Sequence, residues 1–149
     1  IQIAGHEIEW MKYAAKLIEF EGGDLIDINM GCPAKKIVGK FAGSALMKDP
    51  KYALKLIESI VKSTKLPVTL KMRLGWDFDN INAPMIAKSA ENIGVQMITV
   101  HARTRNQFFK GIPNWTLVKA VKDAVSIPII VNDKMKTTII SAQNRSIKK

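Results

Sequence analysis

One stretch of the chain combines a thiol with positive charge: Asn29-Met30-Gly31-Cys32-Pro33-Ala34-Lys35-Lys36. It follows a mostly apolar run, residues 25–28, that predicts a buried strand. Cys32 is the only cysteine of the chain, and the glycine and proline beside it predict a tight loop. A thiol at the end of a strand and beside cations is placed for chemistry. The alternative is a small buried apolar residue, as most free cysteines are.

Polar side chains also end the other predicted strands. Lys71 lies at the end of residues 66–72, His101 ends residues 96–101 and Asn132 ends residues 127–132. Since the carboxyl ends of parallel strands meet at one rim, we expect these side chains to share a site. The same rim is expected to receive four further side chains: Gln2, Asn29, Arg73 and Arg103.

The residue types at this rim narrow the range of ligands that it could bind. Lys71, His101 and Arg103 suit an anion, such as a phosphate or an electron-rich ring. Asn132 and Gln2 offer paired donors and acceptors for the edge of a heteroaromatic ring. Cys32 would act either as a nucleophile, with His101 as its base, or as a general acid toward a carbanion-like centre.

Several common sites are disfavoured by the same sequence. There is no Gly-x-Gly-x-x-Gly or Walker A loop, which disfavours the usual dinucleotide and P-loop sites. No carboxylate pair or His/Cys cluster has metal-ligand spacing, so no metal site is predicted.

The elements that must position these residues alternate along the chain. One helix is predicted over about residues 8–18. Further helices are predicted to begin after Asp49, Asn82 and Asn114, which would cap them. Strands lie between them, so the chain is a parallel α/β protein. Five strands in 149 residues make either an open doubly wound sheet or just over half of a (β/α)₈ barrel, which needs about 250 residues.

Net charge and hydropathy indicate which partners and which compartment to expect. The formal net charge is +10, and residues 134–149 carry five Lys or Arg residues and no acidic one, so we expect a basic tail without a recognisable pattern. This surplus weakly favours a polyanionic partner such as nucleic acid. No apolar run approaches the roughly 18 residues of a membrane span, and no secretory signal is visible. A single cysteine cannot form an internal disulfide, so a cytoplasmic setting is expected.

Three motifs together resemble one family. Residues 27–33 (Asp-Ile-Asn-Met-Gly-Cys-Pro), residues 70–76 (Leu-Lys-Met-Arg-Leu-Gly-Trp) and residues 100–105 (Val-His-Ala-Arg-Thr-Arg) resemble the tRNA-dihydrouridine synthases, and the bacterial branch most. The resemblance implies an FMN-dependent (β/α)₈ barrel. Residues 1–133 would form about five of its βα units, without the first strand, the last strands or the C-terminal helical tRNA-binding domain.

The resemblance also implies a reaction. NADPH reduces FMN, and the C5=C6 bond of a uridine in tRNA is then reduced to dihydrouridine, with Cys32 as proton donor. The family pattern implies roles for seven further residues. FMN contacts are implied for Gln2, Lys71, His101 and Asn132, and substrate contacts for Asn29, Arg73 and Arg103.

The sequence departs from the family after the fifth strand. The chain has Asn132-Asp133-Lys134-Met135 where the family usually has Asn-Gly-Asp-Ile. The loops after strands seven and eight, which usually hold the cofactor phosphate in such barrels, are expected to be missing. The alternative function is therefore an inactive, truncated remnant, which could self-associate through its open sheet edges. Another flavin-dependent barrel, such as a dihydroorotate dehydrogenase, is disfavoured by the Asn-Met-Gly-Cys-Pro motif.

Overall fold

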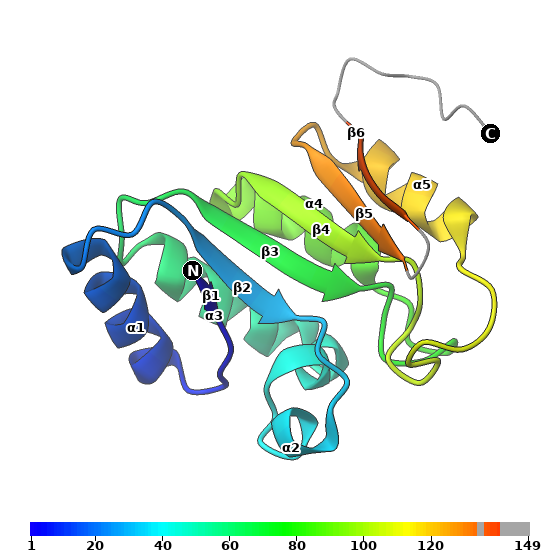
Figure 1. The fold of residues 1–149 in the computed structure, drawn as a ribbon, viewed down its shortest axis with the longest axis horizontal. Helices are drawn as coiled ribbons and strands as arrows, with labels where there is room; N and C mark the ends of the chain where they lie inside the picture. Colours follow the sequence, from blue (N-terminus) through cyan, green and yellow to red (C-terminus); the bar gives the residue numbers. More distant parts are fainter. Residues whose placement is uncertain (134–135, 141–149) are drawn as a thin grey trace.

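Strands and helices alternate through most of the chain in a computed structural model that describes residues 1–133 and 136–140 (Figure 1). The elements are β1 (Gln2–Ile3), α1 (Ile8–Phe20), β2 (Ile26–Met30), α2 (Lys35–Val38), the 3₁₀ helix η1 (Gly43–Lys48), α3 (Pro50–Val61), β3 (Val68–Arg73), α4 (Ala83–Ile93), β4 (Met97–His101), α5 (Trp115–Ala124), β5 (Ile129–Asp133) and β6 (Lys136–Ile140).

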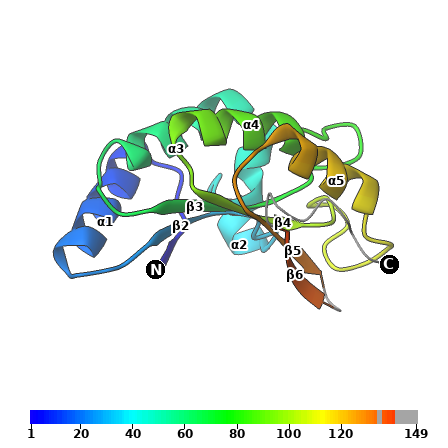
Figure 2. The same cartoon turned by 90° about the horizontal axis from the view of Figure 1, so that it is seen from above.

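The strands form one sheet in the order β1-β2-β3-β4-β5-β6, and the first five run parallel. Each strand therefore lies next to the strand that follows it in sequence. Figure 2 shows α3, α4 and α5 together on one side of the sheet. A doubly wound sheet reverses its strand order and carries helices on both faces. The barrel-type prediction is thus confirmed, as an incomplete (β/α) barrel of five parallel strands.

The helix-covered face of the sheet is the apolar core. The register aligns Ile28, Leu70, Ile98 and Ile129 across four strands, and each of these side chains is fully buried. Burying such a side chain contributes about 1.5–3 kcal/mol to the stability of the fold. Because side chains alternate along a strand, the residues between them point to the opposite, open face.

Two of the three predicted helix caps are confirmed. The Asp49 carboxylate accepts a hydrogen bond from the Tyr52 amide at 2.9 Å, and the Asn114 side chain accepts one from the Leu117 amide at 3.0 Å. The third prediction is wrong. Asn82 precedes α4, but its side chain makes no capping bond and donates instead to the Met47 carbonyl at 2.7 Å. It therefore ties α4 to η1.

β6 was not predicted, because residues 134–149 were expected to be a basic tail without a pattern. This strand pairs antiparallel with β5, from Asp133 opposite Lys136 to Ile129 opposite Ile140. The run of β-branched residues at 137–140 is a strand signal that the net charge of the segment obscured. Only two residues connect β5 to β6, a length that permits an antiparallel hairpin and no parallel crossover. In the described part of the chain no helix is long and apolar enough to cross a membrane.

Candidate functional site

The open face of the sheet carries two neighbouring rows of polar side chains. In one row Asn29 lies opposite Lys71, and in the next Arg73, His101 and Asn132 are aligned across three strands. The sheet register thus brings together residues that are far apart in sequence. This is the rim that the strand ends were expected to form.

Asn29 shapes the loop that carries the thiol. Its Oδ1 accepts hydrogen bonds from the backbone N–H groups of Gly31 (3.1 Å) and Cys32 (3.0 Å), and its Nδ2 donates to Gln2 Oε1 at 2.8 Å. Both lone pairs of the amide oxygen are then used. Asn29 therefore has one N–H left for a ligand, and its main structural effect is to turn the chain toward Cys32.

Gln2 is held in place by a carboxylate in the neighbouring strand. Its Nε2 donates to Asp27 Oδ2 at 2.6 Å, and Thr69 Oγ1 donates to the other oxygen of Asp27 at 2.8 Å. The hydrogen bonds thus run without a break from Thr69 through Asp27 and Gln2 to Asn29. Asp27 and Thr69 were not predicted as site residues, although their position two residues before Asn29 and Lys71 places them on the same face.

Cys32 is half-buried and lies on a loop that packs tightly against η1. Its carbonyl accepts hydrogen bonds from both the amide (3.0 Å) and the hydroxyl (2.9 Å) of Ser44. Gly43 precedes this contact with φ +60°, and a Cβ there would lie 2.8 Å from the Cys32 carbonyl oxygen and 3.2 Å from its Cβ. Only glycine fits between the two segments, so η1 fixes the backbone beneath the thiol.

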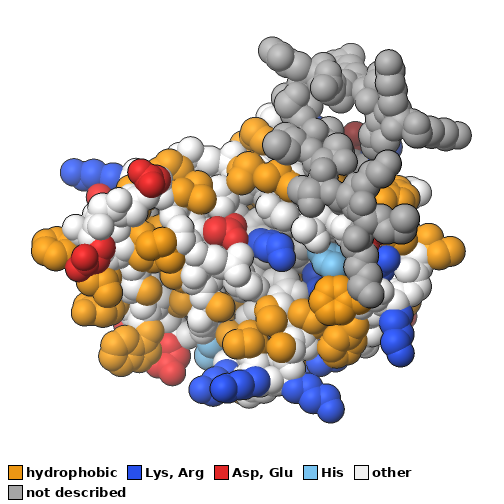
Figure 3. All heavy atoms as spheres, viewed as in Figure 1, with side chains coloured by type: hydrophobic (Ala, Val, Ile, Leu, Met, Phe, Trp, Pro, Cys, Tyr) orange, Lys and Arg blue, Asp and Glu red, His pale blue; other side chains and the backbone are white. Residues whose placement is uncertain are grey.

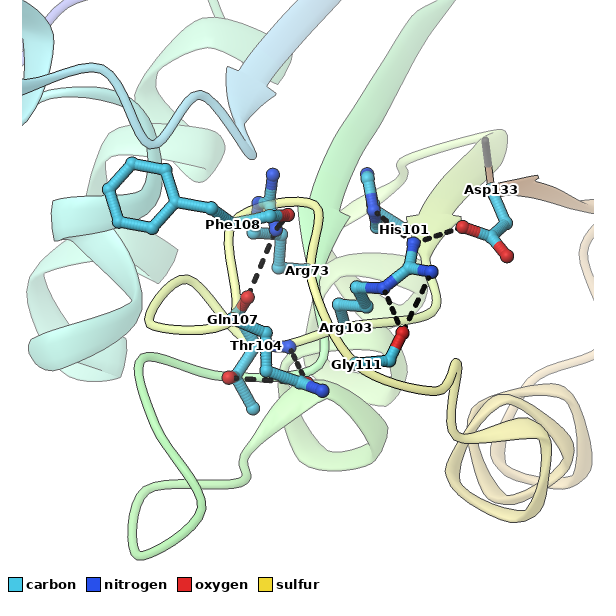
Figure 4. Close-up of polar contacts among 8 residues, drawn as sticks. All are labelled: Arg73, His101, Arg103, Thr104, Gln107, Phe108, Gly111 and Asp133. Carbon is cyan, nitrogen blue, oxygen red and sulfur yellow. Dashed lines mark hydrogen bonds and ion pairs between the residues drawn. The ribbon is translucent and has the colours of Figure 1, made fainter. Parts of the chain in front are cut away.

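Arg73 is buried and joins two loops at the rim. Its Nε donates to the Gly31 carbonyl at 2.7 Å, and its Nη1 donates to the carbonyls of Thr104 (3.0 Å) and Phe108 (2.8 Å). Figure 4 shows this guanidinium beside the loop of residues 104–111. Burial lowers the pKa of Arg73 to about 10, so the side chain stays charged at neutral pH. Its visible role is to hold the thiol loop and residues 104–108 together.

Arg103 is also buried and is bound within the protein. It forms an ion pair with Asp133, donates to the Gly111 carbonyl at 3.2 Å and lies 3.4 Å from His101 Nε2 (Figure 4). Asp133, which the sequence analysis did not assign to the site, thus balances the charge of Arg103. Contact of Arg73 or Arg103 with a substrate stays a prediction, since the structure shows both arginines donating to protein groups.

His101 is held as a neutral imidazole. Burial, together with the positive charges of Arg73 and Arg103, lowers its pKa to about 4. Since a guanidinium can only donate, Nε2 of His101 must accept from Arg103. The proton of the neutral ring is then on Nδ1. His101 therefore offers one N–H donor to a ligand and is too weak a base to take a proton from Cys32 at neutral pH.

Two side chains of the open face have no partner among the residues that the structure describes. Neither the Lys71 ammonium nor the Asn132 amide makes a side-chain hydrogen bond or ion pair with any described residue. Lys71 is half-buried, so its charge is partly removed from water, and no described carboxylate forms an ion pair with it. Such groups are the natural contacts of an anionic or polar ligand.

Comparison with known proteins decides the family. The family model described as dihydrouridine synthase matches residues 1–146. The chain belongs to the dihydrouridine synthase family. A probable tRNA-dihydrouridine synthase of Rhizobium leguminosarum bv. phaseoli is 54% identical over 137 residues, which are 92% of this chain and 43% of that protein. The tRNA-dihydrouridine synthase B of Pasteurella multocida is 49% identical over 132 residues, 89% of this chain and 40% of that one.

This member of the dihydrouridine synthase family spans about two fifths of the length of the curated relatives it matches. Solved structures support the fold alone, at 14% identity. A dihydrodipicolinate synthase of Bacillus anthracis has a TM-score of 0.59 over 84% of this chain and 39% of its own. A putative phosphonomutase of Burkholderia cenocepacia has a TM-score of 0.63 over 82% of this chain and 50% of its own.

The neutral state of His101 predicts a pH dependence. The unfolded chain takes up a proton near pH 6.5 and the folded chain only near pH 4, so this group lowers the free energy of unfolding as the pH falls through that window. Above pH 6.5 both states are neutral and the contribution is constant. The measurement is an NMR titration of the imidazole in a His6→Gln variant, which leaves His101 as the only histidine. A midpoint near 6.5 would contradict the buried, neutral ring.

Proposed function

We propose that this chain carries the catalytic centre of a tRNA-dihydrouridine synthase, which reduces the C5=C6 bond of a uridine in tRNA. The observation that supports the proposal best is the arrangement at the rim. Cys32 lies on a loop fixed by Asn29, next to an open face where Lys71 and Asn132 have no partner among the described residues. A thiol beside unpaired donors is what protonation of a bound heteroaromatic ring requires.

The residues of the open face fit FMN, the cofactor that the family resemblance implies. Lys71 would balance the negative charge of the reduced ring, and Asn132 and the Nδ1–H of His101 would donate to polar atoms at its edge. Gln2 has one free N–H for the same purpose, because Asp27 and Asn29 occupy its other groups. Bound there and reduced by NADPH, FMN would supply the hydride that adds to the uracil ring.

The role of Cys32 is to hold and deliver a proton. Its Sγ would protonate C5 of the uracil, while the second N–H of Asn29 orients the ring. His101 is not the base of a thiolate nucleophile in this proposal, because its pKa is about 4. Of the two roles left open for Cys32 by the sequence, general acid is therefore favoured over nucleophile.

The proposed partner is tRNA, with the cytoplasm as the compartment. The net charge of +10 supports a polyanionic substrate. A uracil within a folded RNA must leave its stack to reach a thiol at a sheet rim, which is the usual solution for enzymes that act on bases.

A second candidate is a chain that keeps the site but does not reduce uridine by itself. The observation in its favour is β6, which pairs antiparallel with β5. That edge is where a further parallel strand of a closed barrel would add. Self-association through the remaining edge, at the short strand β1, is the proposed route by which such a chain would shield its open face.

The absorbance spectrum of the purified chain with added FMN separates the two candidates. We expect stoichiometric flavin after gel filtration, and we expect Lys71→Ala to reduce flavin retention at least tenfold, since it removes the unpaired cation. Lys119→Ala, an exposed lysine of α5 paired with Asp123, is the matched control. A wild-type chain without flavin would favour the inactive remnant, and unchanged retention in Lys71→Ala would remove that residue from the site.

A further inference from the structure

A second group of cations lies beside the proposed site, on the loops that follow β3 and β4. The ring of Trp76 has the Lys48 ammonium 4.0 Å and the Arg105 guanidinium 4.5 Å from its centre, and Arg105 also lies 4.9 Å from the centre of the Phe108 ring. We call these four residues the Trp76 cluster. They come from three segments: η1, the loop after β3 and the loop after β4.

The cluster is held rigidly by the backbone. The amide of Arg105 donates to the Gly75 carbonyl at 2.9 Å, and that of Asn106 donates to the Trp76 carbonyl at 3.0 Å. These bonds join the two loops directly beneath the cations. Phe108 has φ +52°, a left-handed conformation that is unfavourable for a non-glycine residue.

The charges of the cluster are not balanced within the described part of the protein. Among those residues, neither Lys48 nor Arg105 forms an ion pair, and the only side-chain acceptor of Arg105 is Asn106 Oδ1 at 3.2 Å. The Arg105 Nε is buried and has no hydrogen-bond partner within the described part of the chain. Asp77 and Asp79 lie in the same loop as Trp76, but Asp77 accepts from Asn80 instead. The cluster thus offers two cations to an external anion.

A surface hollow of about 730 Å³ adjoins the cluster through Phe108 and Asn106. Phe78 lines it with 67% of its surface exposed, and Lys110 adds a further cation. Figure 3 shows Lys and Arg side chains among hydrophobic ones over the lower right of the molecule, where these loops lie in Figure 1. Alternating aromatic rings and cations are the surface that single-stranded nucleic acids recognise, through stacked bases and phosphates.

We propose that Lys48 and Arg105, positioned by Trp76, bind phosphates of the RNA strand that flanks the target uridine, and that a neighbouring base stacks on Phe78. This inference rests on the proposed function for the identity of its ligand. It adds a binding surface beyond the open face of the sheet. The same loop, residues 104–111, contacts both sites, because Arg73 bonds to its Thr104 and Phe108 carbonyls.

The test is the binding of a short, fluorescently labelled single-stranded RNA to the 149-residue chain, followed by anisotropy at several salt concentrations. We expect Arg105→Gln and Lys48→Gln each to weaken binding roughly five- to tenfold. Each should also lower the slope of log K against log salt by about 0.7 for every phosphate that is no longer neutralised. Phe78→Ala should weaken binding about fivefold or more without changing that slope. Arg105→Lys should retain the slope.

The control is Lys119→Gln, which removes the same charge from α5. We expect it to change the affinity less than twofold, and circular dichroism checks that every variant is folded. The inference would be overturned if the wild type bound no RNA or if Arg105→Gln kept the wild-type affinity. It would also be overturned if Lys119→Gln lost as much affinity as Arg105→Gln. Flavin retention is measured on the same samples. A chain that binds RNA through the cluster but retains no flavin contradicts the proposed reduction alone.

Discussion

Replacing Cys32 by alanine is expected to abolish dihydrouridine formation while leaving flavin retention nearly intact. In the loop between β2 and α2, which Asn29 shapes, only the Cys32 thiol has a proton to give to a carbon atom of a bound base. Loss of a positioned general acid lowers a rate by about 10²–10⁴-fold. The ring contacts proposed for FMN come from β1, β3, β4 and β5, so they do not depend on Sγ. The measurements are dihydrouridine content in a tRNA transcript and flavin absorbance of the same preparation.

Cys32→Ser is the matched control, because it keeps the size of the side chain and replaces the thiol by a much weaker acid. We expect little activity and full flavin content from it as well. As the chain has one cysteine, alkylation by iodoacetamide should reproduce the loss in the wild type and leave the serine variant unmodified. Flavin loss in either variant would show that Cys32 has a structural role. Activity retained in Cys32→Ala would remove the thiol from the reaction.

The fold could be predicted from sequence because local pattern and global arrangement agree. Leu70 and Lys71 are neighbours that face opposite sides of β3, one toward the helices and one toward the open face. The polar side chains were expected to gather at one rim because they lie at the carboxyl ends of parallel strands. The choice between a doubly wound sheet and a barrel could not be made from pattern alone. It depends on the order of strands and the side on which the helices pack, which are contacts between distant segments.

The roles of individual polar residues were harder to predict. Arg73 and Arg103 follow strands that end at the rim, so cationic side chains free for a ligand were expected there. The structure places both beneath loops, where backbone carbonyls and Asp133 accept their hydrogen bonds. The acceptors of Arg73 lie 31 to 42 residues away in sequence. No local pattern encodes such pairs, because they arise only when the loops pack.

Arg73→Met is expected to lower the free energy of unfolding by about 3 kcal/mol, the largest stability effect at this rim. Methionine fills a similar volume but donates no hydrogen bonds. The carbonyls of Gly31, Thr104 and Phe108 would then lose their charged donor. Each buried carbonyl left without a partner costs about 1–3 kcal/mol, and the removal of a buried cation offsets part of the sum. Urea unfolding monitored by tryptophan fluorescence measures the change.

Two further variants distinguish the loss of these hydrogen bonds from the loss of a positive charge. Arg73→Lys keeps the cation, but one ammonium cannot reach carbonyls on both loops, so we expect it to recover less than half of the lost stability. Lys62→Met, at an exposed ion pair with Glu58 at the end of α3, should change stability by less than about 0.5 kcal/mol. Hydrogen exchange should rise in residues 31–44 and 104–111 together in Arg73→Met, because one side chain holds both loops. Faster exchange in only one of the two segments would mean that Arg73 does not couple them, and that the thiol loop owes its position to Asn29 and Ser44 alone.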